Sequence, residues 1–172
     1  ATHPHSDHIG GFSKIIPEFE VGEVIMPVLD DSVIPTTSSF VNMLEAIENG
    51  GIKASSVMAG ERLELDNGLY IEIVAPAKIY TDLNNSSVVA RFVHGENSFL
   101  FTGDIEAEAE ADILETRVDI SADVLKIPHH GSRTSSTKAF VRAVSPSYGV
   151  YCTGADNSYG HPHDEVVERY DN

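Results

Sequence analysis

The sequence contains no tryptophan and a single cysteine, Cys152, among its 172 residues. One cysteine excludes an intramolecular disulfide and a cysteine-ligated zinc cluster. The run from Val150 to Thr153 is typical of a buried strand, so we expect the thiol to lie in the core. No apolar run approaches the ~20 residues of a membrane-spanning helix, and no signal-peptide pattern is present. We therefore expect no membrane segment within this sequence.

Basic residues are also scarce, with 11 Lys and Arg against 27 Asp and Glu and a formal net charge of −16. This balance argues against a broad basic surface for nucleic acid, because such surfaces bind by neutralising phosphates. It does not exclude a nuclease, since bound metal ions supply positive charge locally. The length and the 41% hydrophobic content favour a single globular domain over residues 1–172.

Hydrophobic periodicity predicts a layered domain of the α/β (α+β) class. Antiparallel strands are expected in the middle of the chain, and alternating strands and helices near its end. Helices that cover the faces of sheets follow from this order. Helices are predicted over residues 9–19, 39–49, 105–116, 136–144 and 163–170. Strands are predicted over residues 23–27, 56–58, 62–65, 69–74, 87–93, 98–102, 123–127 and 148–153.

Potential metal ligands are concentrated at the start of the sequence, where HPHSDH occupies positions 3–8 and a glycine pair follows. Histidine and aspartate are ligands that zinc, iron and manganese accept. This spacing cannot place all four side chains on one face of a helix. On a loop that leaves a strand they can diverge toward two adjacent centres, with His3 and His5 at one and Asp7 and His8 at the other.

Two later segments present further ligands at the ends of predicted strands. FLFTGDIE at positions 99–106 places Asp104 just before a helix, where an aspartate is more often an N-cap. DVLKIPHHGS at positions 123–132 ends a strand at Pro128 and continues with His129 and His130. Because three strand ends carry such residues, a metal site where they meet is a better explanation than chance.

The amino-acid sequences of these segments resemble the motifs of a known family. THPHSDHIGG at positions 2–11 resembles the signature of the metallo-β-lactamase superfamily, and TGD at 102–104 and HHGS at 129–132 resemble its later metal motifs. NNSSVVARF at 84–92, LKIPHHGS and YGHPHDEVVERY at 159–170 are similar to the hydrolase domain of ComEC-type competence proteins, which mediate DNA uptake. The resemblance implies a four-layer αββα sandwich with the site at one edge of the paired sheets.

The resemblance also implies a divalent metal cofactor, one or two ions of zinc or manganese. The first ion would be bound by His3 and His5, the second by Asp7, His8 and His130, and Asp104 would bridge the two.

One ligand of the superfamily is missing from this sequence. The superfamily usually supplies a third histidine to the first metal, but the corresponding stretch, residues 83–87, contains none. Weaker binding at the first site is therefore expected. Asn84 or Asn85 offers an amide oxygen, with a turn or hydrogen-bonding role as the alternative. His161 is another candidate, unless it belongs to a structural loop.

The implied chemistry is hydrolysis by a metal-activated hydroxide. Asp7 is a ligand that can also orient the nucleophile or take its proton, and His129 is expected to contact a phosphate or the leaving group, with general acid as the alternative. Ser132 offers a hydroxyl to an anion or caps a helix. The leading hypothesis is a phosphodiesterase or nuclease that acts on DNA or another phosphodiester. The alternatives are a small-molecule metallohydrolase acting on a lactam, lactone or thioester, and a metal-poor fragment without catalysis.

Two further expectations come from comparison with the superfamily. Its members have strands and a helix before the histidine-rich segment and a strand after the final helix, so we expect a domain truncated at both ends. An exposed sheet edge would then allow a homodimer to form. The compartment is unknown: a competence protein would place the domain on the extracytoplasmic face of a membrane, and a free-standing hydrolase would be cytoplasmic or secreted.

Overall fold

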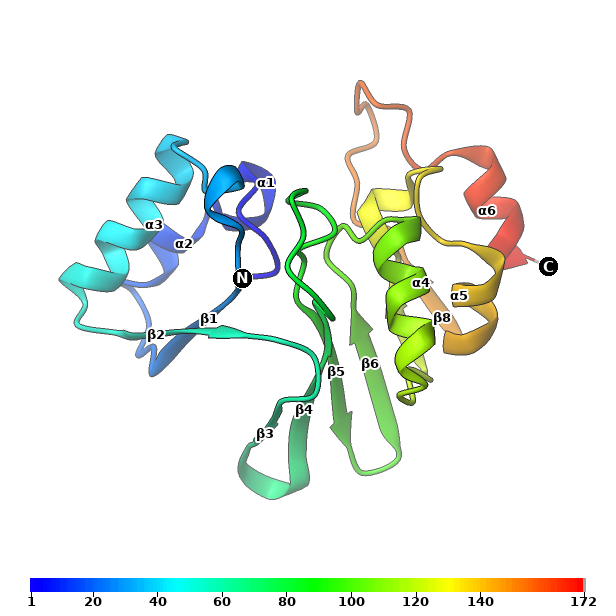
Figure 1. Cartoon of the computed structure of the whole chain (residues 1–172), viewed down its shortest axis with the longest axis horizontal. Helices are drawn as coiled ribbons and strands as arrows, with labels where there is room; N and C mark the ends of the chain where they lie inside the picture. The colour runs from blue at the N-terminus through cyan, green and yellow to red at the C-terminus, as the bar shows by residue number, and fades with distance from the viewer. Residues whose placement is uncertain (172) are drawn as a thin grey trace.

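The computed structural model describes residues 1–171, which form two β-sheets flanked by helices (Figure 1). The smaller sheet pairs β1 and β2 in parallel. The larger sheet has the order β3-β4-β5-β6-β7-β8, antiparallel from β3 to β6 and parallel from β6 to β8. The α-helices are α1 (Ser6–Ile9), α2 (Phe12–Ile15), α3 (Ser38–Asn49), α4 (Ala107–Thr116), α5 (Lys138–Val144) and α6 (Asp164–Asp171). The strands are β1 (Glu23–Pro27), β2 (Lys53–Val57), β3 (Arg62–Glu64), β4 (Leu69–Ala75), β5 (Val89–His94), β6 (Asn97–Phe101), β7 (Val124–Lys126) and β8 (Tyr148–Val150).

Within the described residues, three clusters of buried side chains hold four layers together. One cluster packs α1 to α3 against β1, through residues such as Met43 and Val24. A second lies between the two sheets, where Val57 of β2 meets Ile73 of β4. The third packs α4, α5 and α6 against the larger sheet. The layers therefore follow the order helix, sheet, sheet, helix, as predicted. No helix within residues 1–171 has the length and apolarity needed to cross a membrane.

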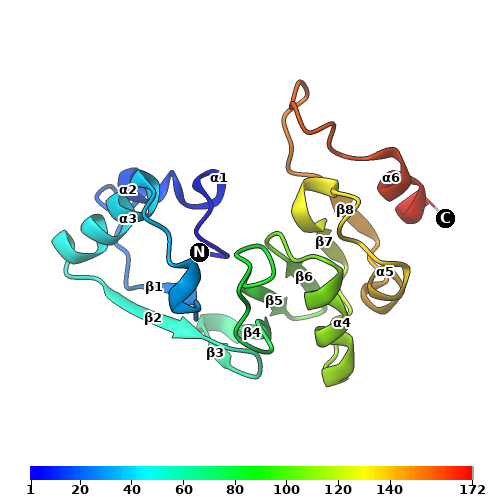
Figure 2. The same cartoon turned by 45° about the horizontal axis from the view of Figure 1, so that its top comes forward.

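The topology brings the predicted ligand segments to one edge of the molecule. Strands β6 and β7 are parallel neighbours, so the segments that follow them, which carry Asp104 and His130, emerge on the same side. The N-terminal segment joins them there, because the carbonyl of Thr2 accepts a hydrogen bond from the backbone N–H of Val88 at 2.8 Å. Figure 2 shows α1 and the segments that follow β6 and β7 on this upper side of the sheets.

The sequence-based element boundaries are wrong at two functionally relevant places. The predicted helix over residues 9–19 is instead two short helices, α1 and α2, separated at Gly10-Gly11. Asp7 and His8 therefore lie on a helix and not on a loop. The last strand, β8, ends at Val150, so the predicted core position of Cys152 is also wrong: this residue is exposed in the loop that follows. A three-residue edge strand buries too little backbone to carry Cys152 into the core.

A buried carboxylate fixes the start of α5. Glu110 on α4 is fully buried, and it accepts hydrogen bonds from the backbone N–H groups of Ser136 at 2.5 Å and Thr137 at 2.7 Å. Burial raises the pKa of Glu110 above its ordinary value, although these donors oppose the shift. The contact joins the segment that follows the His129-His130 pair to α4.

Replacement of Glu110 by glutamine should destabilise the protein by about 1–3 kcal/mol, because an amide can accept only one of the two hydrogen bonds well and leaves a buried donor unsatisfied. Urea unfolding would measure this loss. Glu115→Gln, an exposed position on the same helix, is the matched control and should change little. Equal stability of the two variants would contradict a structural role for Glu110.

Candidate metal centre

Four side chains from three segments converge on one point. The Nε2 atom of His130 lies 3.0 Å from Oδ2 of Asp104 and 3.3 Å from both Nε2 of His8 and Oδ2 of Asp7. The Nε2 atom of His8 lies 3.1 Å from Oδ2 of Asp104 and 3.5 Å from Oδ2 of Asp7. Ligand atoms of a tetrahedral ion with bonds of about 2.0–2.2 Å are roughly 3.3–3.6 Å apart. These five separations are close to that range and the ligand atoms of all four residues lie within 4.8 Å of one another, so the cluster could hold a single divalent ion.

Hydrogen bonding shows that this cluster needs a cation. Nδ1 of His130 must carry a proton, because it lies 2.6 Å from the carbonyl oxygen of Cys152, which can only accept. In the neutral ring Nε2 then carries a lone pair and no proton, and it faces the carboxylate oxygens of Asp7 and Asp104. Three hydrogen-bond acceptors this close together repel one another unless a proton or a metal ion lies between them.

The pKa shifts of His130 and Asp104 arise from hydrogen bonds within this cluster. The hydrogen bond to Asp104 raises the pKa of His130, since it stabilises the protonated ring. Burial opposes ionisation of Asp104, but the hydrogen bonds from His130 and His8 outweigh it and hold the pKa of this carboxyl far below its ordinary value. Asp104 is therefore an anion at neutral pH, and an ion that enters the cluster displaces a proton.

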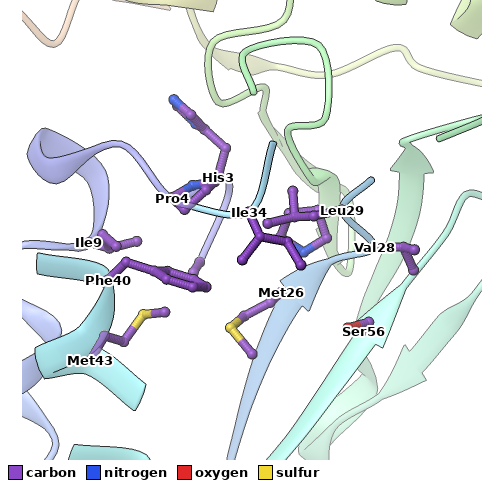
Figure 3. Close-up of a pocket in the computed structure, with 12 residues that line it drawn as sticks. His3, Pro4, Ile9, Met26, Val28, Leu29, Ile34, Phe40, Met43 and Ser56 are labelled. Carbon is purple, nitrogen blue, oxygen red and sulfur yellow. The ribbon is translucent and has the colours of Figure 1, made fainter. Parts of the chain in front are cut away.

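A second pair of imidazoles lies next to the cluster. Nε2 of His3 is 2.9 Å from Nδ1 of His5, and the other ring nitrogen of His3 is 3.2 Å from the hydroxyl of Ser87. His3 is fully buried, and burial together with the neighbouring His8 lowers its pKa to about 3. Figure 3 shows His3 at the edge of an apolar pocket, with its ring directed away from Met26 and Phe40. The ring is thus neutral and turned toward His5.

Two residues that line the same pocket as His5 each have a buried oxygen without a hydrogen-bond donor. Within residues 1–171, Oδ1 of Asp104 and Oδ1 of Asn84 are buried and accept no hydrogen bond. The nearest cation to the Asp104 oxygen is the amine of Lys126 at 3.6 Å, which donates instead to the carbonyl of Gly103 at 2.9 Å. Buried acceptors are rarely left unsatisfied, so both oxygens are suited to a bound ion.

Unusual backbone geometry positions the histidine pair that follows β7. His129, His130 and Gly131 have φ values of 47°, 55° and 85°, a left-handed run that side chains with a Cβ rarely adopt. Glycine is required at the third position, since a Cβ there would lie 2.6 Å from Cβ of Pro162. The run turns the chain so that His129 and His130 both line the same pocket.

Comparison with known proteins agrees with this geometry. Residues 1–155 match the family model described as the metallo-beta-lactamase superfamily. The chain belongs to this superfamily. Two curated relatives are ComE operon protein 3 of Bacillus subtilis, 30% identical over 97% of this chain, and competence protein ComA of Neisseria gonorrhoeae, 31% identical over 98% of it. The chain spans about a fifth (21%) of the length of each relative.

The fold has a solved neighbour. The structure of CmlA, a diiron beta-hydroxylase from Streptomyces venezuelae, aligns with 98% of this chain and 40% of its own, with a TM-score of 0.55 and 16% sequence identity. At this identity the likeness concerns the fold alone. Together with the family match, it confirms the predicted metallo-β-lactamase fold. The two curated relatives confirm the resemblance to competence-type proteins. Membership of this superfamily supports a metal-dependent hydrolase that uses divalent ions.

The remaining predicted site residues separate into two groups. His129 and His161 line the pocket beside the metal ligands, as does Asn84. Asn85 does not: its Oδ1 accepts hydrogen bonds from the backbone N–H groups of Glu106 at 2.9 Å and Ala109 at 3.4 Å. Asn85 thus caps the start of α4.

Ser132 also lies outside the pocket lining. Its hydroxyl is buried and contacts the hydroxyl of Thr134 at 3.0 Å and the backbone N–H of the same residue at 3.4 Å. This arrangement fits the local turn that precedes α5 better than contact with an anion.

Sequence reasoning missed several residues that orient the site. Glu106 accepts a hydrogen bond from Nδ2 of Asn84 at 3.4 Å, and its Oε1 lies 3.2 Å from Nδ1 of His129. Ser87 contacts His3 and accepts a hydrogen bond from the backbone N–H of Asp104 at 3.1 Å. The carbonyl of Cys152 fixes the tautomer of His130. No local pattern identifies these partners, except that Glu106 lies two positions after Asp104.

Proposed function

We propose that this chain is a metal-dependent phosphodiesterase of the nuclease type, with DNA as its substrate class. The observation that carries the proposal is the four-ligand cluster of Asp7, His8, Asp104 and His130 in a chain similar to competence-type proteins. Three of its members, Asp7, Asp104 and His130, line a pocket open to solvent. The acidic composition is compatible with a nucleic-acid substrate, because bound ions would supply the positive charge that the protein surface lacks.

The chain's own residues divide the work as follows. One divalent ion would be held by Asp7, His8, Asp104 and His130, and a second by His3, His5, Asp104 and Asn84. Zinc and manganese are metals that suit these donors. When bound, such ions lower the pKa of a water molecule and stabilise charge on phosphate oxygens.

Two residues serve the substrate side of the pocket. Asp7 has the most exposed carboxylate of the cluster, at 63% of its side-chain surface, so it can also orient the attacking water or receive its proton. His129 is held by Glu106 and faces the same pocket, where we assign it to the phosphate or the leaving group.

Hydrolysis assays with purified protein would test this proposal. We expect cleavage of single-stranded DNA and of a simple phosphodiester in manganese or zinc, loss of cleavage with a chelator, and no hydrolysis of a β-lactam. Cleavage of the lactam but of neither phosphodiester would replace the proposal with a small-molecule hydrolase. Stoichiometric metal binding without turnover of any of these substrates would show a non-catalytic domain.

A further inference from the structure

An exposed aromatic side chain lies at the metal pocket without an evident structural role. Tyr159 belongs to the loop between β8 and α6, which projects beyond the sheets (Figures 1 and 2). It lines the pocket together with Asp7 and His130, yet 77% of its surface is accessible. Within the described residues its hydroxyl makes no hydrogen bond. An aromatic ring left this exposed, beside a reactive centre, is available to a ligand.

The ring of Tyr159 is held in a defined orientation. It stacks on the imidazole of His161, with ring centroids 5.7 Å apart and an interplanar angle of 20°. His161 in turn lies nearly parallel to His130, at 17° and 6.3 Å. Offset stacks of this kind are favourable at centroid distances of about 4.5–7 Å. One face of Tyr159 is thus occupied by His161, and the other remains for a planar group.

The loop itself is fixed by one asparagine. Oδ1 of Asn157 accepts a hydrogen bond from the backbone N–H of His161 at 2.9 Å, and its Nδ2 donates to the carbonyls of His161 at 2.6 Å and Gly154 at 2.8 Å. These bonds close the loop on itself, so the stacked pair is preorganised and loses little conformational entropy when a ligand binds.

Charge indicates which ligand suits the pair. No lysine or arginine is found among the pocket-lining residues of the described chain, and the net charge is −16, so a polyanion gains little from basic side chains here. Apart from the charge that bound ions would supply, the contact still open to a nucleic acid in this pocket is with its bases. Every nucleobase has a planar face, and stacking on aromatic side chains is the usual sequence-independent way to bind a single strand.

We propose that Tyr159, backed by His161, is a stacking subsite for an unpaired nucleobase next to the phosphodiester that the metal centre receives. This inference rests on the proposed function for the identity of the phosphodiester. A base can reach the exposed face of Tyr159 only when it has left a duplex, so the subsite selects single strands, frayed ends or flipped nucleotides over intact double helix.

The test uses a short single strand that contains 2-aminopurine, whose fluorescence falls on stacking, with manganese present. Tyr159→Leu keeps the bulk but removes the planar ring, and should weaken binding roughly 5- to 100-fold. Tyr159→Phe should bind as the wild type does. Tyr148→Ala is the matched control, because this tyrosine is 70% exposed on β8 and does not line the pocket. An abasic strand of the same length should bind weakly and equally to all four proteins.

Each outcome has a defined meaning. If Tyr159→Leu binds and quenches the probe as the wild type does, the subsite does not exist, whether or not the strand is cleaved. The same conclusion follows if the wild type leaves the probe fluorescent, or if the variant loses affinity for the abasic strand to the same degree. If the wild type quenches the probe through Tyr159 but cleaves no strand, the subsite is supported and the proposed phosphodiesterase activity fails separately.

Discussion

Replacement of Asp104 by asparagine is expected to lower metal affinity by about 10²–10³-fold and to abolish hydrolysis. The carboxylate contacts both His8 and His130, and within residues 1–171 its remaining oxygen is buried without a donor. A four-ligand zinc site contributes about 10–16 kcal/mol, so one ligand of four accounts for roughly 2.5–4 kcal/mol. The change to an amide also removes a negative charge that would balance the positive charge of the bound ion.

Isothermal calorimetry and thermal unfolding would measure this effect. The wild type should gain about 2.7 kcal/mol of stability at a metal concentration 100 times the dissociation constant, and Asp104→Asn should gain almost none at the same concentration. Asp66→Asn, an exposed carboxylate far along the chain from every ligand, is the control for loss of one charge. A variant at Asp104 that binds metal as tightly as the wild type would remove this residue from the centre.

Replacement of Asn84 by alanine is expected to reduce the metal content from two ions per chain to one. Its buried amide oxygen has no donor within residues 1–171, and its Nδ2 is turned to Glu106, which leaves the oxygen for the ion shared with His3 and His5. Loss of one neutral ligand should lower the affinity for that ion by roughly 10²-fold and leave metal binding at the four-ligand cluster unchanged.

Elemental analysis after dialysis, at graded metal concentrations, distinguishes the two sites. Asn84→Asp should restore the second ion, since it offers an oxygen at the same place, whereas Asn42→Ala, an exposed asparagine on α3, should leave both ions in place. Two tightly held ions in Asn84→Ala would show that His161 or a water molecule completes the first site. A single ion in the wild type would show that this amide is not sufficient.

Local patterns in the sequence were sufficient for individual helices and strands, whereas the order of the four layers was implied only by the resemblance to the superfamily. The hairpin of β5 and β6 was predictable from alternating residues around a short turn at Gly95 and Glu96, and α3 from the periodic spacing of Phe40, Met43 and Ile47. The start of α1 was not, because the His5 carbonyl begins the helix within a segment that is dominated by metal ligands. Helical geometry there depends on backbone hydrogen bonds that no hydrophobic pattern reveals.

The candidate ligands were predictable from residue type, but their supports were not. Histidine and aspartate at strand ends are conspicuous in a sequence, whereas Glu106 looks like an ordinary helix-start acid and Tyr159 like an ordinary loop residue. The roles proposed for them depend on contacts that the fold creates, such as that of Glu106 with His129, 23 positions later by their numbers. Asn84 and Asn85 illustrate the limit: neighbouring asparagines with identical chemistry face a pocket and a helix start respectively.

The distance along the chain between the ligands has a consequence for when the centre appears. His8 and His130 are 122 positions apart, and closing a loop of that length costs roughly 4 kcal/mol of chain entropy plus a constant. We expect such a contact to form after the sheet between the two residues has assembled, because pairing of the strands shortens the loop that remains to be closed. Partly folded chains would therefore lack the assembled cluster, and any hydrolysis that depends on it would begin only once the domain has folded.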